Sequence, residues 1–183
     1  MIIGNPSTFA IESILSKAYR DTPQKALGSI VIFVDGMGYG CRAPVATTLG
    51  FPLEHARARI CRRGRHIAPF SKYKSAASIV DALLAAEFNE AQQHELFFGL
   101  STRQINEIVG SNHIDWASDV DESFDEGSHV YHFDVGERVR LIGCINAADR
   151  CVHEAWLAAD DYYEIIDSWQ TCLEQQITNL AKQ

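Results

Sequence analysis

The stretch Ser128-His-Val-Tyr-His-Phe-Asp-Val135, followed by Gly136-Glu137 and Arg138-Val-Arg-Leu-Ile-Gly-Cys-Ile145, decides the fold class. Both flanking runs are rich in β-branched and aromatic residues, and a short glycine-containing turn separates them. This spacing is typical of a β-hairpin, whose two strands are antiparallel. The sequence therefore predicts a sheet built from antiparallel strands.

Further strands are expected on both sides of this hairpin. A β-branched run covers Ser29–Asp35 and is bounded by Gly28 and Gly36, which predicts a buried strand. The glycines after it favour a tight hairpin turn, with the chain returning over Tyr39–Arg42. Patterns of apolar residues predict two shorter strands, over Phe9–Leu15 and Val152–Leu157.

Helices are expected between and after these strands. Apolar residues at helical spacing predict one over Ser75–Phe88, and Ser101 with Gln104 forms a capping box that opens another, ending near Gly110. A basic helix over about 52–63 is expected, with Thr47 and Thr48 as its caps.

The last helix is the longest. Asp160 and Asp161 are its expected caps, with Glu164 at the capping-box position. One apolar face is expected to consist of Ile165, Ile166, Trp169, Leu173, Ile177 and Leu180. Hairpins and helices without regular alternation predict an α+β fold: a mainly antiparallel central sheet, helices packed on it and a long C-terminal helix. With no repeat or linker, residues 1–183 are expected to form a single domain.

Composition narrows the possible compartments and partners. The N-terminus lacks a signal-peptide pattern, and the five scattered cysteines contain no Cys-x-x-Cys pair, so a reducing cytoplasm is expected. The net charge of -8 disfavours nucleic acid as the main partner, because phosphate neutralisation needs excess Lys and Arg. Charge is unevenly distributed: residues 54–74 contain seven basic residues and one acid, while residues 107–174 contain sixteen acids and three arginines. One basic and one acidic face are expected.

Two segments resemble catalytic or metal-binding motifs. The strand that ends in Asp35-Gly36-Met37-Gly38 resembles the first metal-binding segment of alkaline-phosphatase-like hydrolases, but no further ligand cluster follows, and a hairpin turn is the favoured interpretation. His129 and His132 are three residues apart on a strand and should face opposite sides, so they cannot share a metal. No catalytic residue, cofactor or metal is therefore expected.

Several longer segments together resemble a family of small bacterial immunity proteins from polymorphic-toxin and contact-dependent growth inhibition systems. The matching segments are Met1–Glu12, Ser75–Leu83, Phe124–Ser128, Phe133–Ile142 and Trp156–Tyr163. They run nearly from end to end of the chain. The segment Lys17–Gly28 and the basic helix match least, so the resemblance implies no role for their residues.

The resemblance implies a non-catalytic antitoxin that binds the toxic C-terminal domain delivered by a neighbouring cell. Such toxins are often nucleases with basic clefts. The irregular segment from Asn112 to Gly127 is expected to be a long acidic surface loop, suited to such a cleft. The candidate toxin-binding residues are Asp115, Asp119, Asp121, Glu122, Asp125 and Glu126.

Three alternatives remain open. A second candidate toxin-binding face is the basic helix, with Arg59, Arg62 and Arg63. Arginines of the same helix could instead bind RNA or DNA. A metal-dependent phosphoester hydrolase that uses Asp35 is the alternative function.

Overall fold

The computed structural model describes residues 1–19, 26–88, 96–116, 122–147 and 149–182. A first antiparallel sheet has the order β1-β2-β3-β4, and β5 also pairs with β3. Its strands are β1 (Ile2–Asn5), β2 (Phe9–Ala18), β3 (Ala26–Val34), β4 (Met37–Tyr39) and β5 (Thr47–Thr48). The expected buried run is β3, the central strand of this sheet.

The β3–β4 connection is a tight turn at Asp35 and Gly36. Both residues have positive φ, 50° and 83°, as a two-residue hairpin turn of the favoured hand requires. The pairing of Val34 with Met37 continues directly from the turn. The hairpin interpretation of this motif is confirmed, but the return strand is Met37–Tyr39 and not the expected Tyr39–Arg42. Asp35 lies exposed in the turn.

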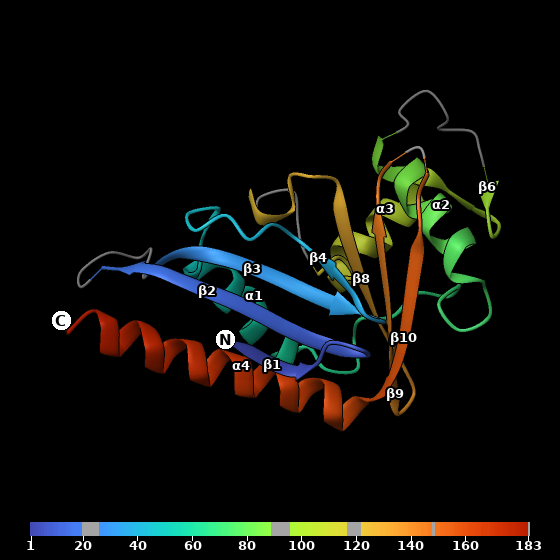
Figure 1. Cartoon of the computed structure of the whole chain (residues 1–183). Coiled ribbons are helices and arrows are strands. Elements are labelled where there is room, and N and C mark those ends of the chain that lie inside the picture. Colours follow the sequence, from blue (N-terminus) through green and yellow to red (C-terminus); the bar gives the residue numbers. More distant parts are fainter. Residues whose placement is uncertain (20–25, 89–95, 117–121, 148, 183) are drawn as a thin grey trace.

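The second antiparallel sheet has the order β10-β9-β8. It consists of β8 (Ser128–Val135), β9 (Arg138–Ile145) and β10 (Val152–Ala158), and its register places Val135 opposite Arg138. The predicted hairpin is therefore confirmed. Figure 1 shows this sheet crossing the end of the first, with α2 and α3 on its outer side and α4 running along the first sheet. The expected single central sheet is thus divided into two.

Four α-helices complete the fold in the part of the chain that the structure describes, and the expected α+β class is confirmed. They are α1 (Gly50–Cys61), α2 (Ala76–Phe88), α3 (Thr102–Asn112) and α4 (Ala159–Leu180). Short elements are the β6–β7 pair (Leu96–Phe97 and Leu100–Ser101) and the 3₁₀ turn η2 (Glu122–Phe124). The expected capping box of α3 is present, with both Ser101 and Gln104 engaged.

Two expected helix caps were wrong. Thr47 and Thr48 form β5 instead of capping α1, whose N-cap is Leu49 without a side-chain hydrogen bond. The N-cap of α4 is Ala158, and Asp160 and Asp161 lie in the first turn. There the carboxylates still stabilise the helix, because they interact favourably with the positive end of its dipole. The α3 helix also continues two residues beyond Gly110.

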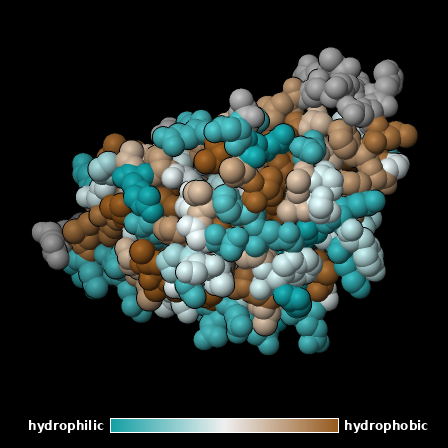
Figure 2. Space-filling view, turned by 45° about the vertical axis from the view of Figure 1, so that its right-hand side comes forward, coloured by the Kyte–Doolittle hydropathy of each residue, from teal (hydrophilic) through white to brown (hydrophobic). Residues whose placement is uncertain are grey.

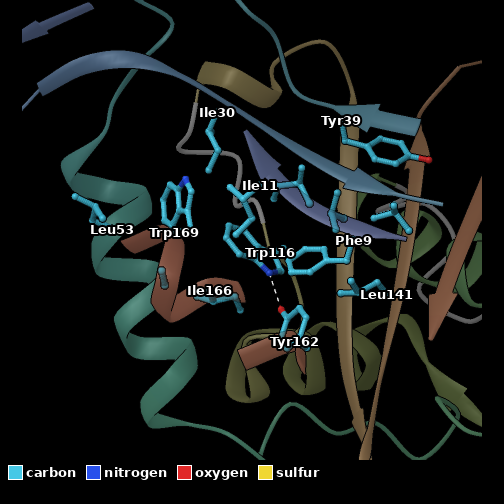
Figure 3. Packing of buried hydrophobic residues seen from close by; sticks show 14 of the residues in the cluster. Phe9, Ile11, Ile30, Tyr39, Leu53, Trp116, Leu141, Tyr162, Ile166 and Trp169 are labelled. Carbon is cyan, nitrogen blue, oxygen red and sulfur yellow. Dashed lines mark hydrogen bonds between the residues drawn. The ribbon is translucent and has the colours of Figure 1, made fainter. Parts of the chain in front are cut away.

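Two hydrophobic cores lie on opposite faces of the β8–β10 sheet. Because strand side chains alternate, Val130 and Leu141 face the first core, which contains β2, β3, α1 and α4, whereas Tyr131 and Ile142 face the second, which contains α2 and α3. Figure 3 shows the first core around Trp116, whose indole N–H donates to the Tyr162 hydroxyl at 2.7 Å.

The long helix α4 contributes much of the first core. Its buried side chains are Tyr162, Tyr163, Ile166, Trp169, Leu173 and Ile177. The Trp169 indole N–H donates to the Ser13 hydroxyl on β2, so this buried polar group is also satisfied. Of the expected apolar face, Ile165 and Leu180 are only half-buried.

Candidate functional site

The acidic segment lies between α3 and β8. Asp119 and Asp121 fall outside the described residues, and of Glu122 only the backbone, in η2, is described. Asp125 and Glu126 are exposed in the turn that leads into β8, and Asp115 is half-buried at the start of the segment. The described part therefore brings Asp125 and Glu126 together on the surface and places Asp115 at the other end.

The start of this segment is fixed by Arg59, which extends from α1 into the interior. One of its terminal nitrogens (Nη2) donates to the Asp115 carbonyl oxygen at 2.7 Å, and the other (Nη1) to the His113 carbonyl oxygen at 3.2 Å. Its guanidinium carbon lies 5.2 Å from the centre of the Trp116 ring, a cation–π distance. Backbone pairing of Asp115 with Tyr131 adds a link to β8.

The end of the segment is fixed against the chain just after β4 and leads directly into β8. The Cys41 N–H donates to the Ser123 carbonyl oxygen at 2.7 Å, and Phe124 is buried in the first core. Gly127, with φ of 79°, turns the chain into β8 and donates to the Phe124 carbonyl oxygen. Both ends of the acidic segment are thus held by the folded framework.

A buried polar network continues from Arg59 across β8 to α4. Arg59 Nη1 lies 2.7 Å from His132 Nδ1, and because an arginine can only donate, this nitrogen must accept. His132 is therefore neutral, with its proton on Nε2, which faces a carboxylate oxygen of Asp134 at 3.2 Å. Burial lowers the pKa of His132, which agrees with the neutral ring.

Asp134 is the negative centre of this network. Burial opposes its ionisation, but donation from His132, from the His66 backbone N–H (3.0 Å) and from the Tyr163 hydroxyl (2.9 Å) outweighs burial, so the pKa is lowered. Burial and this carboxylate raise the pKa of Tyr163. The network joins α1, β8 and α4 and stabilises the base of the acidic segment.

Sequence patterns did not reveal this network. Arg59 was expected on a basic surface, yet only 4% of it is exposed. Helical spacing is the sequence pattern that could have predicted this burial. Leu53, Ala56 and Arg59 recur at three-residue steps and lie on the buried side of α1. His129 and His132 do face opposite sides of the sheet, as expected: His132 packs on Tyr162 of α4, and His129 packs on Phe88 of α2.

The other arginines of the basic helix contact the rest of the fold. Arg63 forms an ion pair with Asp160 of α4, Arg57 with Glu174 of α4, and Arg62 donates to the Ser111 carbonyl oxygen. Arg63 and Asp160 line a surface pocket of about 410 Å³ at the end of the β8–β9 hairpin. Charges of opposite sign therefore meet along α1 and α4, where a purely basic face was expected.

Figure 2 shows hydrophilic side chains along the α4 edge and hydrophobic patches toward the end that carries α2 and α3. Phe88 and Leu96 are among the exposed apolar residues of that end, at 56% and 66%.

Within the described ranges, no three His, Cys, Asp or Glu side chains are grouped so that they could hold a metal ion. No helix in the same ranges is long and apolar enough to cross a membrane.

Comparison with known proteins identifies the class as that of immunity proteins. The family model of Immunity protein 42 (Imm42) matches residues 1–172, and the chain belongs to this family. An immunity protein neutralises a cognate toxin.

Among solved structures, the crystal structure of CdiI from Burkholderia dolosa AUO158 is similar, with a TM-score of 0.60 and 20% sequence identity. The match covers 93% of this chain and 99% of that chain, which shows a shared fold. Comparison with curated protein sequences gives no match.

Proposed function

We propose that this protein is a cytoplasmic, bacterial immunity protein that neutralises a cognate toxin domain by binding it directly, without catalysis. The observation that carries the proposal is the Imm42 family match over residues 1–172. The shared fold with a protein named CdiI favours a toxin delivered by contact-dependent growth inhibition.

The toxin is proposed to be a nuclease with a basic cleft, bound through the acidic segment. Asp119, Asp121, Glu122, Asp125 and Glu126 place five acids within eight residues, with no Lys or Arg among them. Carboxylates form strong charge-assisted hydrogen bonds with the arginines and lysines that a nuclease uses for phosphate. Such a segment would compete with nucleic acid for the cleft.

The described flanks of the segment support this assignment. Arg59 holds the Asp115 carbonyl at one end, and the Cys41 N–H holds the Ser123 carbonyl at the other. Fixed ends lower the conformational entropy that a loop loses on binding, which favours affinity. Asp125 and Glu126 are already exposed to a partner.

The basic helix is the less favoured face. Arg59 is buried, and Arg63 is already paired with Asp160, so a partner would have to displace these contacts. The variant Arg62→Glu/Arg63→Glu tests this face while leaving the buried Arg59 in place. We expect it to bind the toxin within a few-fold of wild type.

Growth rescue tests the function itself. The gene of the cognate toxin would be expressed in a sensitive bacterium, with and without this protein. We expect growth only when this immunity protein is present. An Imm42 protein that belongs to a different toxin should not restore growth. Absence of rescue, with both proteins soluble and detectable, would refute the proposal.

A further inference from the structure

A second, smaller pocket of about 80 Å³ opens between α1 and the end of α3. It is lined by His55, Ala58, Arg59, His66 and His113. Ala58 and His113 are exposed and form its rim, whereas Arg59 and His66 are buried and form its floor. None of the five lining residues is acidic. The pocket therefore combines an open mouth with a floor of basic side chains.

Arg59 has an unused donor in this region. Its terminal nitrogens donate to His132 and to two backbone carbonyls, but its Nε atom is buried and has no hydrogen-bond partner among the described residues. An unpaired buried N–H is costly to a fold. Arg59 also lines the pocket, so its positive charge acts on any group bound there.

Both ring nitrogens of His66 face backbone carbonyl oxygens, more acceptors than a neutral ring can donate to. Its Nδ1 lies 2.9 Å from the Asn112 carbonyl oxygen, and its Nε2 lies 3.2 Å from the Arg59 carbonyl oxygen. Carbonyls only accept, and a neutral imidazole has one N–H, so only the protonated ring can donate to both. Burial and the charge of Arg59 nevertheless lower the pKa of His66. A negative charge in the pocket would oppose both effects.

Arg59 is the positively charged neighbour of His66, whereas the lowered pKa of His113 favours a neutral ring. Arg59 and His55 face it from α1, and His113 faces it from the end of α3, with Arg62 close to His113. From β8, the neutral His132 ring lies 4.5 Å away between centroids.

The negative group among these neighbours is Asp134 of β8. Its carboxylate accepts the His66 backbone N–H and is already shared with His132 and Tyr163. Its carboxylate therefore already has three partners, and Asp134 is not among the residues that line the pocket.

We propose that this pocket binds one small oxyanion, of the size of a carboxylate or a sulfate, and that His66 takes up a proton when it is occupied. A water molecule occupies roughly 30 Å³ in the liquid, so the volume suits a single such group. The proton comes from solvent and is added to His66 Nε2, which then donates to the Arg59 carbonyl. The site has the opposite charge to the acidic segment, and its existence does not depend on toxin binding.

Sulfate is a suitable probe because its charge is constant between pH 6 and pH 8. We expect saturable shifts of the His66 and His113 imidazole signals in NMR spectra, with at least about tenfold tighter binding at pH 6 than at pH 8, as linked proton uptake requires. Calorimetric heats should change with the ionisation enthalpy of the buffer. Binding that is not saturable, or equal at both pH values, would overturn the proposal.

A matched pair of variants locates the site. Ala58→Glu adds a carboxylate at the rim of the pocket, and Ala77→Glu adds the same charge on the exposed side of α2. We expect Ala58→Glu to abolish the sulfate response and Ala77→Glu to retain it. Equal responses from the two variants would place any binding elsewhere and overturn the proposal.

The same assay distinguishes a free oxyanion from an acidic side chain of a protein partner as the occupant of the pocket. Acetate should compete with sulfate if the pocket accepts a carboxylate; failure to compete would exclude a carboxylate and contradict the proposed range of ligands. Bound toxin that excludes sulfate would identify an acidic side chain of a protein partner as the occupant. Unchanged sulfate binding in that complex would identify a free oxyanion. Either result of this last arm supports an oxyanion site.

Discussion

The sequence around Arg59 suggested an exposed side chain, whereas the structure buries it. Four other arginines lie within six positions of it, which suggested a solvated basic surface. In the fold it is buried, its guanidinium bridges α1 to His132 and to the Asp115 carbonyl, and it stacks near Trp116. Local charge patterns do not report burial, because burial depends on which helix face meets the core.

Replacing Arg59 should therefore be costly. Arg59→Met leaves two part-buried backbone carbonyls and the buried His132 Nδ1 without their donor, and we expect a loss of about 3–5 kcal/mol in the free energy of unfolding, measured with urea. The control Arg62→Met removes a half-buried neighbour with one backbone contact and should cost less than about 1 kcal/mol. Equal losses in the two variants would contradict the proposed role of Arg59.

The neutral state of His132 makes a pH prediction. Its folded pKa is lowered, so between its unfolded pKa of about 6.5 and its folded pKa the unfolded chain binds more protons. Stability should fall as the pH decreases below about 6.5, by about 1.4 kcal/mol per pH unit for each such histidine. Asp134, whose folded pKa is also lowered, should add to this loss below about pH 4.

The variant His132→Gln isolates this effect. Glutamine can accept from Arg59 and donate to Asp134, but it does not titrate. We expect a urea-unfolding profile between pH 6.5 and pH 4.5 that is shallower than wild type by about one proton. A variant profile parallel to wild type would show that His132 does not carry this pH dependence.

At the scale of elements, the hairpins were predictable and the joint between the two sheets was not. The β8–β9 and β3–β4 hairpins depend on local signals, namely alternation, Gly136 and the Asp35-Gly36 turn. The joint depends on contacts between distant residues: the ring of Tyr39 on β4 packs against Gly143 on β9, and its hydroxyl lies 2.7 Å from His153 Nδ1 on β10. No periodicity within one strand encodes such a pairing.

Gly143 is required at this joint. A Cβ atom built on it would lie 2.2 Å from the Tyr39 ring, so Gly143→Ala must displace the ring or the strand and should cost about 1–3 kcal/mol. The matched control is Gly110→Ala in α3, where a Cβ meets nothing within 4 Å, and it should stabilise by about 0.5–1 kcal/mol. Thermal unfolding compares the two variants. Similar effects in both would mean that the sheets do not meet at Tyr39 as described.

At the scale of the whole molecule, the sequence predicted the α+β class, the long last helix and the immunity-protein family. It did not predict the division into two sheets or the buried network beneath the acidic segment. These features depend on long-range packing between α1, β8 and α4. We propose that the chain forms one domain, because the two cores share β8 and β9. Coincident unfolding curves from tryptophan fluorescence and circular dichroism would support one cooperative unit, and separated curves would contradict it.

Two pairs of variants with the same change in net charge separate local contacts of the acidic segment from long-range attraction. Asp125→Asn/Glu126→Gln removes two exposed acids of the segment, and Glu164→Gln/Asp167→Asn removes two exposed acids of α4. Both pairs change the net charge equally, so long-range attraction to a basic toxin falls by a similar amount. We expect the first pair to weaken binding at least tenfold more than the second. Equal weakening would assign the effect to net charge alone.

Calorimetric titration of the purified toxin domain into this protein measures whether the two bind directly and through the acidic segment. We expect saturable binding to the wild type. We expect at least about 10²-fold weaker binding, equivalent to about 2.7 kcal/mol, when all five acids within 119–126 are changed to Asn or Gln, with the fold unchanged by circular dichroism. The remaining affinity should depend less on salt. A wild-type protein that rescues growth but shows no binding to the purified toxin would contradict neutralisation by direct contact, and a neutralised segment that binds as tightly as wild type would contradict the proposed face.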